Sequence, residues 1–573
     1  MSIDMRNVAH GAASAVRSCP FDLVARAFLA LDGCLRLMDP HRNGQPFAYA
    51  ELHTEPPVAL HAPWDHYDVA GRLLEALTLC RVMTGTAPDN LDEELAALLR
   101  VNQREDGLVQ LPPEPWAANT SLVELEWSPR AALLAWTTRI LAVDDRDART
   151  RADRLVHALA KTAVWEADTC WFPATLLPET GWKNRSMPQT ATLDCLPGAQ
   201  LVFPLARYAE CTGSDLALRM AHGFIRGVRE RSGAFEKDGT ATLKAARYLH
   251  SNLNFILGVL KYGLVARSDD DVSWAQSAYD RARDHGTDFG FFPRHTGGEG
   301  RVFGDTCALS VMIEIAILLA LHRDPRYFAD AERYGRNHLL ESQFVNMEWL
   351  EASQEVEFCD DLWCANHPTH GVSTDEVSRK SLGGFAGWSQ PNDCFDAEHP
   401  RLNQRCSGSG LRALYALWHY SITKPEGAVR VNMHFSRDSK WATVTSRLPV
   451  DGSIEVTMKS RGVLTVRVPD GLTQEQVAVT VNFERGRSEQ IRGGLAWIEA
   501  LQQGDVVSIA WPLNKRSATY ALNGLNYTGE WRGETLVGMS PMGRLSPLYE
   551  RNVAFPAAPA LGAVGPVREI DTL

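Results

Sequence analysis

The sequence lacks the features that mark membrane-spanning, exported and nucleic-acid-binding proteins. No apolar run approaches the roughly 18 residues that a membrane helix needs. Residues 1–16 mix acidic and basic side chains and contain no apolar stretch typical of a signal peptide. No block rich in lysine or arginine is present, and the net charge of −12 disfavours nucleic acid or an anionic membrane as a partner. We therefore expect a cytoplasmic protein without nucleic-acid or membrane partners, and a homodimer stays open.

A disulfide framework is also absent. The 11 cysteines are an odd number scattered from Cys19 to Cys406, whereas disulfide-rich secreted domains are short and carry paired cysteines. The content of 45% hydrophobic and 22% charged residues is that of an ordinary globular protein. A chain of 573 residues is too long for one simple core, so we expect about two or three domains.

Amphipathic segments with a period of about 3.6 residues dominate the chain up to residue 425. Breaker-rich turns such as Thr84-Gly85 and Thr212-Gly213 join many of them in pairs. About six antiparallel helix pairs predict an (α/α)6 toroid with loops and helix starts around a concave face, although an irregular α-solenoid would give the same periodicity. We expect helices near residues 20–38, 68–84, 91–100, 130–143, 152–164, 196–211, 215–231, 244–265, 272–285, 305–322, 325–343 and 407–422.

After residue 425 the pattern changes to an alternation with a period of two residues. Turns such as Asp451-Gly452 and Asn523-Gly524 fit β-hairpins between the alternating segments. The pattern predicts an antiparallel β-sandwich. We therefore divide the chain into a toroid (1–425), a sandwich (426–555) and a tail (556–573) that is rich in Ala, Pro and Gly and expected to be mobile. Strands are expected at 429–435, 453–459, 463–468, 477–483 and 505–512.

Loops between the expected helices are rich in aromatic and acidic residues. Asp65 and His66 lie just before one helix, Trp388 lies in another loop, and the chain has 16 tryptophans in all. Aromatic rings cover the apolar C–H faces of a sugar, and carboxylates and amides bind its hydroxyls. The loops therefore indicate a carbohydrate substrate with Asp65, His66 and Trp388 as contacts, although a single tryptophan often only packs helices together.

The segment Gly297 to Leu309 reads G-G-E-G-R-V-F-G-D-T-C-A-L and leads into a long apolar helix. Its glycines let the backbone bend closely around a ligand. Asp305 stands at an expected helix N-cap, and Cys307 follows near the helix N-terminus, where the pKa of a thiol is lowered. Glu299, Asp305 and Cys307 are thus candidate site residues, while a capped helix after a tight turn would give the same spacing.

These motifs resemble glycoside hydrolase family 127, the β-L-arabinofuranosidase family, over nearly the whole chain. Gly298-Glu299 resembles the family's G-E acid/base motif, and Asp305-Thr306-Cys307-Ala308 resembles its E-T-C-A motif, with Asp for Glu. His250, in the sequence Y-L-H-S-N, resembles a histidine that contacts the substrate. The resemblance implies an (α/α)6 barrel with C-terminal β-sandwiches, a glutamate acid/base, and a zinc-bound cysteine thiolate that acts as nucleophile with retention of configuration.

The sequence departs from the family at a cysteine pair. Arg405-Cys406-Ser407 stands where the family has C-C-P-P-N. We prefer the register that puts Cys406 at the nucleophile and Ser407 at a lost zinc ligand. A slip of one residue makes Cys406 the ligand and Arg405 the missing nucleophile.

The ligand set that the resemblance implies for zinc is therefore incomplete. Asp305, Cys307 and Cys406 supply three ligands, whereas zinc normally takes about four N, S or O ligands. Cys394 or His399 could supply another, but their spacing does not decide the matter.

Cleavage of a glycosidic bond needs a proton donor for the leaving oxygen and a nucleophile or activated water. Glu299 would donate the proton, and Cys406 would attack the anomeric carbon after help to ionise from a metal, a helix N-terminus or Arg405, which is also a candidate substrate contact. We expect a retaining exo-glycosidase acting on a small glycoside or oligosaccharide, with an arabinofuranoside as one candidate. The alternatives are inversion with Glu299 and Asp305, a polysaccharide lyase or sugar epimerase of toroid fold, and a non-catalytic carbohydrate-binding protein.

Overall fold

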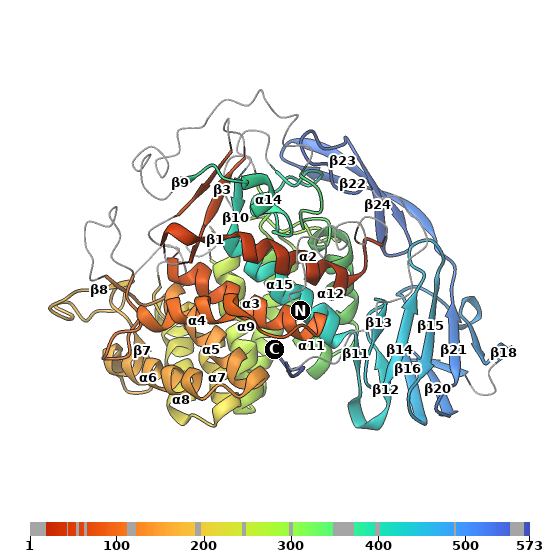
Figure 1. Cartoon of the computed structure of the whole chain (residues 1–573). Coiled ribbons are helices and arrows are strands. Elements are labelled where there is room, and N and C mark those ends of the chain that lie inside the picture. Colours follow the sequence, from red (N-terminus) through yellow and green to blue (C-terminus); the bar gives the residue numbers. More distant parts are fainter. Residues whose placement is uncertain are drawn as a thin grey trace.

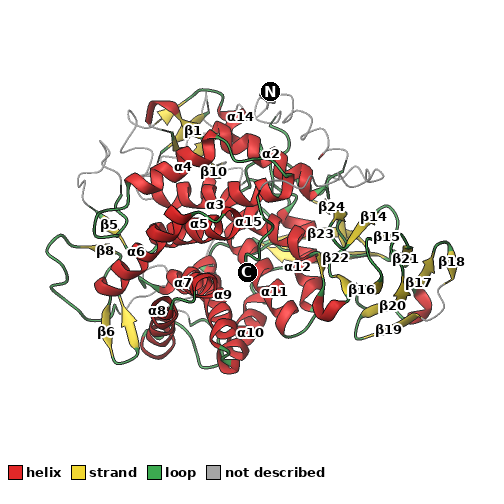
Figure 2. Ribbon diagram, turned by 60° about the horizontal axis from the view of Figure 1, so that its bottom comes forward, coloured by secondary structure: helices red, strands yellow, loops and turns green. Residues whose placement is uncertain are grey.

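The computed structural model describes residues 16, 19–42, 44–52, 57–61, 66–111, 122–188, 196–242, 248–296, 302–347, 372–395, 401–485, 489–550 and 567–573. Figure 1 shows a helical body with a body of β-strands beside it. Turned by 60°, the helices gather around a common centre and the C-terminal strands lie to one side (Figure 2). A helical toroid followed by an antiparallel β domain, as predicted, is confirmed.

The toroid has an inner ring in which each helix packs against the next and the last packs against the first. The inner helices are α3 (His66–Thr84), α5 (Trp127–Val143), α7 (Val202–Thr212), α9 (Leu249–Ala266), α11 (Thr306–His322) and α15 (Gln404–Tyr420). Packed outside them are α2 (Leu23–Arg36), α4 (Asn90–Val101), α6 (Arg146–Thr162), α8 (Asp215–Arg226), α10 (Asp269–Arg283) and α12 (Tyr327–Tyr334). Each expected helical segment overlaps one of these helices, and π-helical turns at Gly227–Arg231 and Gly335–Leu339 extend α8 and α12.

Inner and outer helices differ in how their apolar residues are distributed. In α11 every residue from Thr306 to Ala320 is buried, because neighbours surround the helix on all sides. The outer helix α6 buries only a stripe that includes Ala152, Leu155 and Leu159. A one-sided stripe gives the 3.6-residue period, and a helix buried all round gives a long apolar run.

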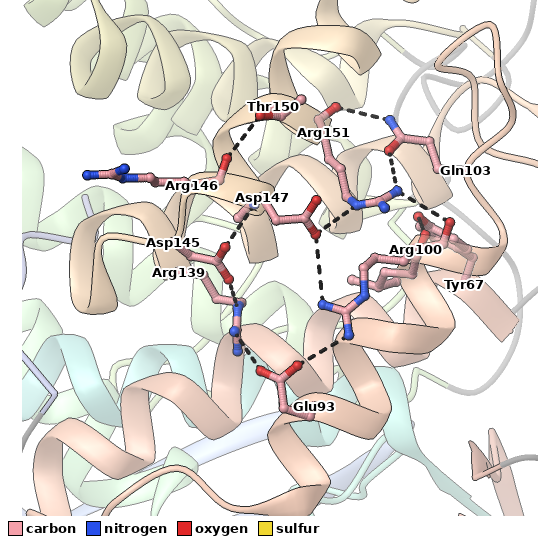
Figure 3. Close-up of polar contacts among 12 residues, drawn as sticks. Tyr67, Glu93, Arg100, Gln103, Arg139, Asp145, Arg146, Asp147, Thr150 and Arg151 are labelled. Atoms are coloured by element: carbon pink, nitrogen blue, oxygen red, sulfur yellow. Dashed lines mark hydrogen bonds and ion pairs between the residues drawn. The ribbon is translucent and has the colours of Figure 1, made fainter.

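Ion pairs join α4, α5 and α6 on the outer surface (Figure 3). Glu93 of α4 pairs with Arg139 of α5 at 3.0 Å and with Arg100 at 3.2 Å. Asp147 of α6 pairs with Arg151 at 2.9 Å and with Arg100 at 3.8 Å. A single exposed pair contributes only about 0–1 kcal/mol, so the network chiefly fixes how the outer helices sit on the inner ring.

Short strands interrupt the toroid loops, and the sequence analysis did not anticipate them. A four-stranded sheet has the order β10-β3-β4-β9, and two-stranded sheets pair β1 with β2, β5 with β8 and β6 with β7. Such short strands carry too little alternating pattern to stand out from loops. Strand β10 runs directly into α15, so this sheet fixes the start of the helix that carries Cys406.

The bounds of these short strands are β1 (Met38–Asp39), β2 (Gln45–Pro46), β3 (Tyr49–Glu51), β4 (Val58–Leu60), β5 (Val123–Glu124), β6 (Val164–Glu166), β7 (Thr169–Trp171), β8 (Leu176–Leu177), β9 (Val372–Ser373) and β10 (Arg401–Asn403), and a short helix α14 (Val377–Ser381) follows β9.

Two sheets of the C-terminal region share one hydrophobic core and form the expected sandwich. Their strand orders are β11-β12-β16-β20-β19 and β13-β14-β15-β21-β17-β18, and all pairs are antiparallel except β12 with β16. Val431 and Val466 of one sheet pack with Val456 and Ile509 of the other. The strands are β11 (Ile422–Thr423), β12 (Val429–Val431), β13 (Arg437–Asp438), β14 (Ala442–Ser446), β15 (Ser453–Met458), β16 (Gly462–Arg467), β17 (Ala478–Val481), β18 (Glu484–Arg485), β19 (Glu489–Arg492), β20 (Leu495–Leu501) and β21 (Val506–Ala510).

A third sheet leaves the sandwich and covers loops of the toroid. It consists of β22 (Lys515–Leu522), β23 (Leu525–Arg532) and β24 (Thr535–Ser540), and it is seen above the sandwich in Figure 1. Trp531 of β23 packs in a cluster with Phe289 and Phe291 of the toroid. At the tip of the predicted Asn523-Gly524 hairpin, the Asn523 amide donates at 2.9 Å to the carbonyl of Val302, which belongs to the segment 297–309. The Asn523-Gly524 turn was predicted, but the strands of this sheet were not among those expected from the sequence, and neither was the core on which they pack.

The last residues pack against the toroid. Val567, Ile570 and Leu573 are buried, and the hydroxyl of Tyr415 in α15 donates to the carbonyl of Ile570 at 2.7 Å. The prediction of a mobile tail is therefore wrong for residues 567–573, while 556–566 lie outside the described residues. Within the described part of the chain, we find no helix with the length and apolarity needed to cross a bilayer.

Candidate active site

Four inner helices begin at one cavity of about 300 Å³. Trp127 is the first residue of α5, Tyr248 is the N-cap of α9, Asp305 is the N-cap of α11 and Asn403 is the N-cap of α15, and all four line the cavity. Helix N-termini carry partial positive charge, so their convergence favours negative charge in the cavity. The remaining lining residues are Arg72, His250, Arg294, His295, Cys307, Trp388, Arg405 and Cys406.

The thiols of Cys307 and Cys406 meet at the wall of this cavity. Their Sγ atoms are 3.3 Å apart, and Sγ of Cys406 lies 4.0 Å from Oδ1 of Asp305. The same oxygen accepts the backbone N–H of Cys307 at 2.7 Å and so caps α11. The three side chains are buried. They converge as expected from the sequence, although the two cysteines are 99 residues apart.

The contact between the thiols pushes their pKa values in opposite directions. The hydrogen bond with Cys406 lowers the pKa of Cys307 below its usual range, and the nearby Arg72 guanidinium acts in the same sense. The same hydrogen bond, together with burial, raises the pKa of Cys406 well above its usual range. Of the two thiols, Cys307 is therefore the first to ionise, and Cys406 keeps its proton to a higher pH.

Asp305, Cys307 and Cys406 also form a donor set that fits a metal ion. One ligand atom from each lies within 4.8 Å of the others, and all three residues are buried. Two sulfurs and a carboxylate oxygen suit zinc, and three protein ligands leave the open position that catalytic zinc sites have. Among the described residues no fourth Cys, His, Asp or Glu joins this cluster. The alternative ligand Cys394 packs in the hydrophobic cluster of Phe344, and His399 lies outside the described residues.

The two neighbours of Cys406 face different surroundings. The hydroxyl of Ser407 accepts the backbone N–H of Phe385 at 3.1 Å, and Ser407 is not among the residues that line the cavity. Arg405 does line it and donates from Nη2 to the hydroxyl of Tyr49 at 2.9 Å. Ser407, expected at the position of a lost zinc ligand, therefore contacts the backbone of Phe385 and not the cavity. The residue beside Cys406 that does line the cavity is the positively charged Arg405.

His250 lines the cavity as a neutral imidazole ring. Arg130 donates to Oδ1 of Asn254 at 2.8 Å, which leaves the Asn254 amide to donate to Nε2 of His250 at 2.7 Å. This network places the ring hydrogen on Nδ1, which is buried and has no acceptor among the described residues. Burial and the neighbouring arginines hold the pKa of His250 well below its usual range. The ring stacks on Trp127 with 5.5 Å between centroids and presents an N–H donor.

The structure brings together most of the residues predicted from sequence. Asp305, Cys307, Cys406, His250, Trp388 and Arg405 all line one cavity. Glu299 and Asp65 lie outside the described residues, and His66 begins α3 with a side chain that is likewise not described.

Several lining residues were missed by sequence reasoning. Tyr248 lies inside the helix expected at 244–265 and Asn403 lies four residues before the one expected at 407–422, because both helix starts were misplaced. Arg72, Trp127 and Arg294 carry no local signal, because only the ring of helices brings them together.

No protein-family model matches this sequence, and no curated protein is significantly similar to it. Solved structures are similar in fold. The β-L-arabinofuranosidase Ara127N of glycoside hydrolase family 127, from Geobacillus stearothermophilus T6, has a TM-score of 0.54 at 15% identity, over 92% of this chain and 84% of that one. The family 127 β-arabinofuranosidase BT3674 has a TM-score of 0.56 at 14% identity, over 91% and 81%. The chain therefore has the fold of the glycoside hydrolase family 127 arabinofuranosidases.

Proposed function

We propose that this protein is a glycoside hydrolase that removes a terminal sugar from a small glycoside or oligosaccharide with retention of configuration. An arabinofuranoside is the first substrate to test, because arabinofuranosidases share the fold. The observation that carries the proposal is the thiol pair of Cys307 and Cys406 at a cavity lined by Trp127, Tyr248 and Trp388. A cavity of about 300 Å³ is at the small end for ligand sites, which supports recognition of one terminal sugar.

The nucleophile in this proposal is the thiolate of Cys406. Once the pair has lost one proton, the remaining proton sits on Cys406, and its transfer to Cys307 across the 3.3 Å contact would leave Cys406 ionised. The thiolate forms a bond to the anomeric carbon as the glycosidic C–O bond breaks. Arg405 beside Cys406 stabilises the thiolate electrostatically.

The acid/base in this proposal is Glu299, which donates its proton to the leaving oxygen. The same carboxylate then takes a proton from water, whose oxygen displaces the sulfur from the anomeric carbon. Two displacements at one carbon restore its configuration. If zinc is bound by Asp305, Cys307 and Cys406, it supplies positive charge that keeps the thiols ionised.

The test is a panel of nitrophenyl furanosides and pyranosides with the wild type, Cys406→Ala and, as a matched control, Cys211→Ala. Cys211 is a half-buried cysteine of α7 that does not line the cavity. We expect release of nitrophenol from at least one glycoside, loss of turnover in Cys406→Ala and retention in Cys211→Ala. Proton NMR of the first-formed sugar should show the substrate's anomeric configuration.

Other outcomes point to other functions. An unsaturated, ultraviolet-absorbing product would indicate a lyase, and a free sugar changed at one stereocentre would indicate an epimerase. Binding of sugars without turnover of any glycoside would indicate a carbohydrate-binding protein. Full activity in Cys406→Ala would exclude the thiolate mechanism.

A further inference from the structure

We infer that the cavity recognises a sugar that carries a carboxylate, and that Arg294 binds this carboxylate. The inference rests on the proposed function in that it names the substrate class of the same site. It starts from an imbalance in the cavity wall, which contains three arginines, Arg72, Arg294 and Arg405, but only one described carboxylate, Asp305.

The arginines differ in what compensates their charge. Arg72 donates to Asp68 at 2.8 Å and acts on the thiol of Cys307. Arg405 donates to the hydroxyl of Tyr49 at 2.9 Å and lies beside Cys406. Arg294 forms no ion pair with any carboxylate of the described residues. Its guanidinium instead lies over the rings of Trp388, at 4.6 Å from the centroid, and Tyr248, at 5.4 Å.

The backbone holds Arg294 firmly at the cavity. Its N–H donates to the carbonyl of Phe303 at 2.7 Å, and its carbonyl accepts the N–H of Leu249, the first residue of α9, at 3.0 Å. Ring stacking uses the faces of a guanidinium and leaves the N–H groups along its edge to donate. A carboxylate matches that edge with two parallel hydrogen bonds.

Two residues of the cavity lining carry further N–H groups. The Nδ1–H of His250 and the indole N–H of Trp388 are buried without an acceptor among the described residues. Four helix N-termini add partial positive charge, as described above. A neutral sugar both donates and accepts through its hydroxyls, but it brings no negative charge to the edge of Arg294. A sugar carboxylate supplies both a negative charge and additional acceptors.

A matched pair of ligands isolates the charge. We would measure binding of sodium D-glucuronate and sodium D-galacturonate against their methyl esters by calorimetry, and turnover of the corresponding nitrophenyl uronides and esters. We expect the acid form of at least one sugar to be preferred by about 10- to 100-fold, as for a charged hydrogen-bonded pair. The preference should shrink at high salt, because ions screen the pair.

Two substitutions assign the preference to Arg294. Arg294→Gln should abolish it, and Arg294→Lys should retain part of it, because lysine keeps the charge and loses the planar fork. The matched control is Arg492→Gln, which removes an arginine stacked 4.4 Å over Trp497 in the sandwich, and it should leave the preference unchanged. Thermal unfolding of each variant verifies its fold.

The inference and the proposed function can fail separately. Equal binding of acids and esters, no binding of either, or an unchanged preference in Arg294→Gln overturns the inference, even where neutral glycosides are cleaved. Arg294-dependent binding of the acids without cleavage of any glycoside supports the inference and overturns the hydrolase. A preference for a nitrophenyl sugar sulfate over every uronide would show that the anion is a sulfate and overturn the carboxylate assignment.

Discussion

At the scale of single residues, the site depends on one proton shared by two sulfurs. Cys307 and Cys406 lie 3.3 Å apart in a buried setting, and their contact makes Cys307 the first of the two to ionise. Burial alone would raise the pKa of both thiols, as it does for Cys34, to about 12. The pKa of Cys307 is instead lowered by its hydrogen bond with Cys406 and by the nearby guanidinium of Arg72. The pair is therefore chemically distinct from a structural cysteine of the same protein.

The acid/base assignment to Glu299 is tested by a choice of leaving group. Positioned acid catalysis contributes about 10²–10⁴-fold in rate. Glu299→Gln should lose at least about 10²-fold on an alkyl glycoside, whose leaving oxygen needs a proton, and much less on a nitrophenyl glycoside. Steady-state kinetics on both substrates measures the difference. If Glu299→Gln cleaves the alkyl glycoside as fast as the wild type, Asp305 and Asp65 are the next acids to substitute.

Sequence reasoning reached the site residues that stand beside a local signal. Asp305, Cys307 and Cys406 lie at helix starts within short motifs, so both their positions and their convergence could be predicted. Arg72 and Arg294 have no such motif. Their place in the cavity results from the ring of helices and from the pairing around Phe303, which the sequence pattern does not reveal.

At the scale of elements, Asp305 serves both α11 and the thiol cluster, and two substitutions separate these roles. Asparagine caps helices about as well as aspartate, so Asp305→Asn should change the free energy of unfolding by less than about 0.5 kcal/mol. Asp305→Ala should cost roughly 1 kcal/mol, because the N–H groups of Cys307 and Ala308 lose their acceptor. Both variants should lose the carboxylate's contribution to metal binding, measured by elemental analysis after dialysis against zinc. Equal stability of the two variants would show that the cap is unimportant.

The C-terminal segment joins the toroid to the sandwich through Glu569. This carboxylate accepts from His419 of α15 at 2.8 Å and from Arg437 of β13 at 2.5 Å. These partners hold its pKa at about 2, below its usual value. A depressed folded-state pKa adds stability above the unfolded value, near 4.5, and that stability is lost as the pH falls from about 4.5 to about 2.

Glu569→Gln should therefore destabilise the protein at pH 7 and have little effect near pH 2. We expect roughly 1–3 kcal/mol at pH 7, discounted because the side chain is partly exposed. Urea unfolding of wild type and variant across this pH range measures the difference. A constant difference at all pH values would show that packing, and not the charge of Glu569, holds the segment.

The sequence predicts the helices of this protein better than its short strands. A helix such as α6 repeats its apolar stripe over four turns or so, whereas β9 has two residues in which to show a pattern. The strands of the sandwich were intermediate in how well the sequence predicts them, because a strand such as β15 alternates buried and half-buried residues along its whole length. The third sheet has this alternation too, but no periodicity indicates that Trp531 packs on toroid phenylalanines.

At the scale of the whole molecule, a buried charge cluster connects the toroid, the sandwich and the third sheet. Glu332 of α12 pairs with Arg336 at 2.7 Å, with Arg467 of β16 and with His434, whose Nδ1 lies 3.3 Å away. Arg467 also pairs with Glu534, between β23 and β24, at 3.2 Å. The two arginines already supply the positive charge that Glu332 and Glu534 need, so this cluster serves as a joint between domains.

Removing the charge of Glu332 should loosen that joint. Glu332 is buried together with Arg336 and Arg467, and its pKa is held well below the usual range against the effect of burial, by His434 and the two arginines. Glu332→Gln would leave buried cations short of a counterion, which typically costs about 3–5 kcal/mol.

The loss should appear as a change in how the molecule unfolds, because the joint lies between parts that each have their own core. In urea the variant should unfold in two steps, with the sandwich separating from the toroid, where the wild type unfolds closer to one step. Tryptophan fluorescence and circular dichroism, which weight the two parts differently, would then give different midpoints. The matched control Glu455→Gln removes a half-buried glutamate of β15 outside this cluster and should leave the midpoints together. A variant Glu332→Gln with wild-type midpoints would mean that apolar contacts alone hold the domains together.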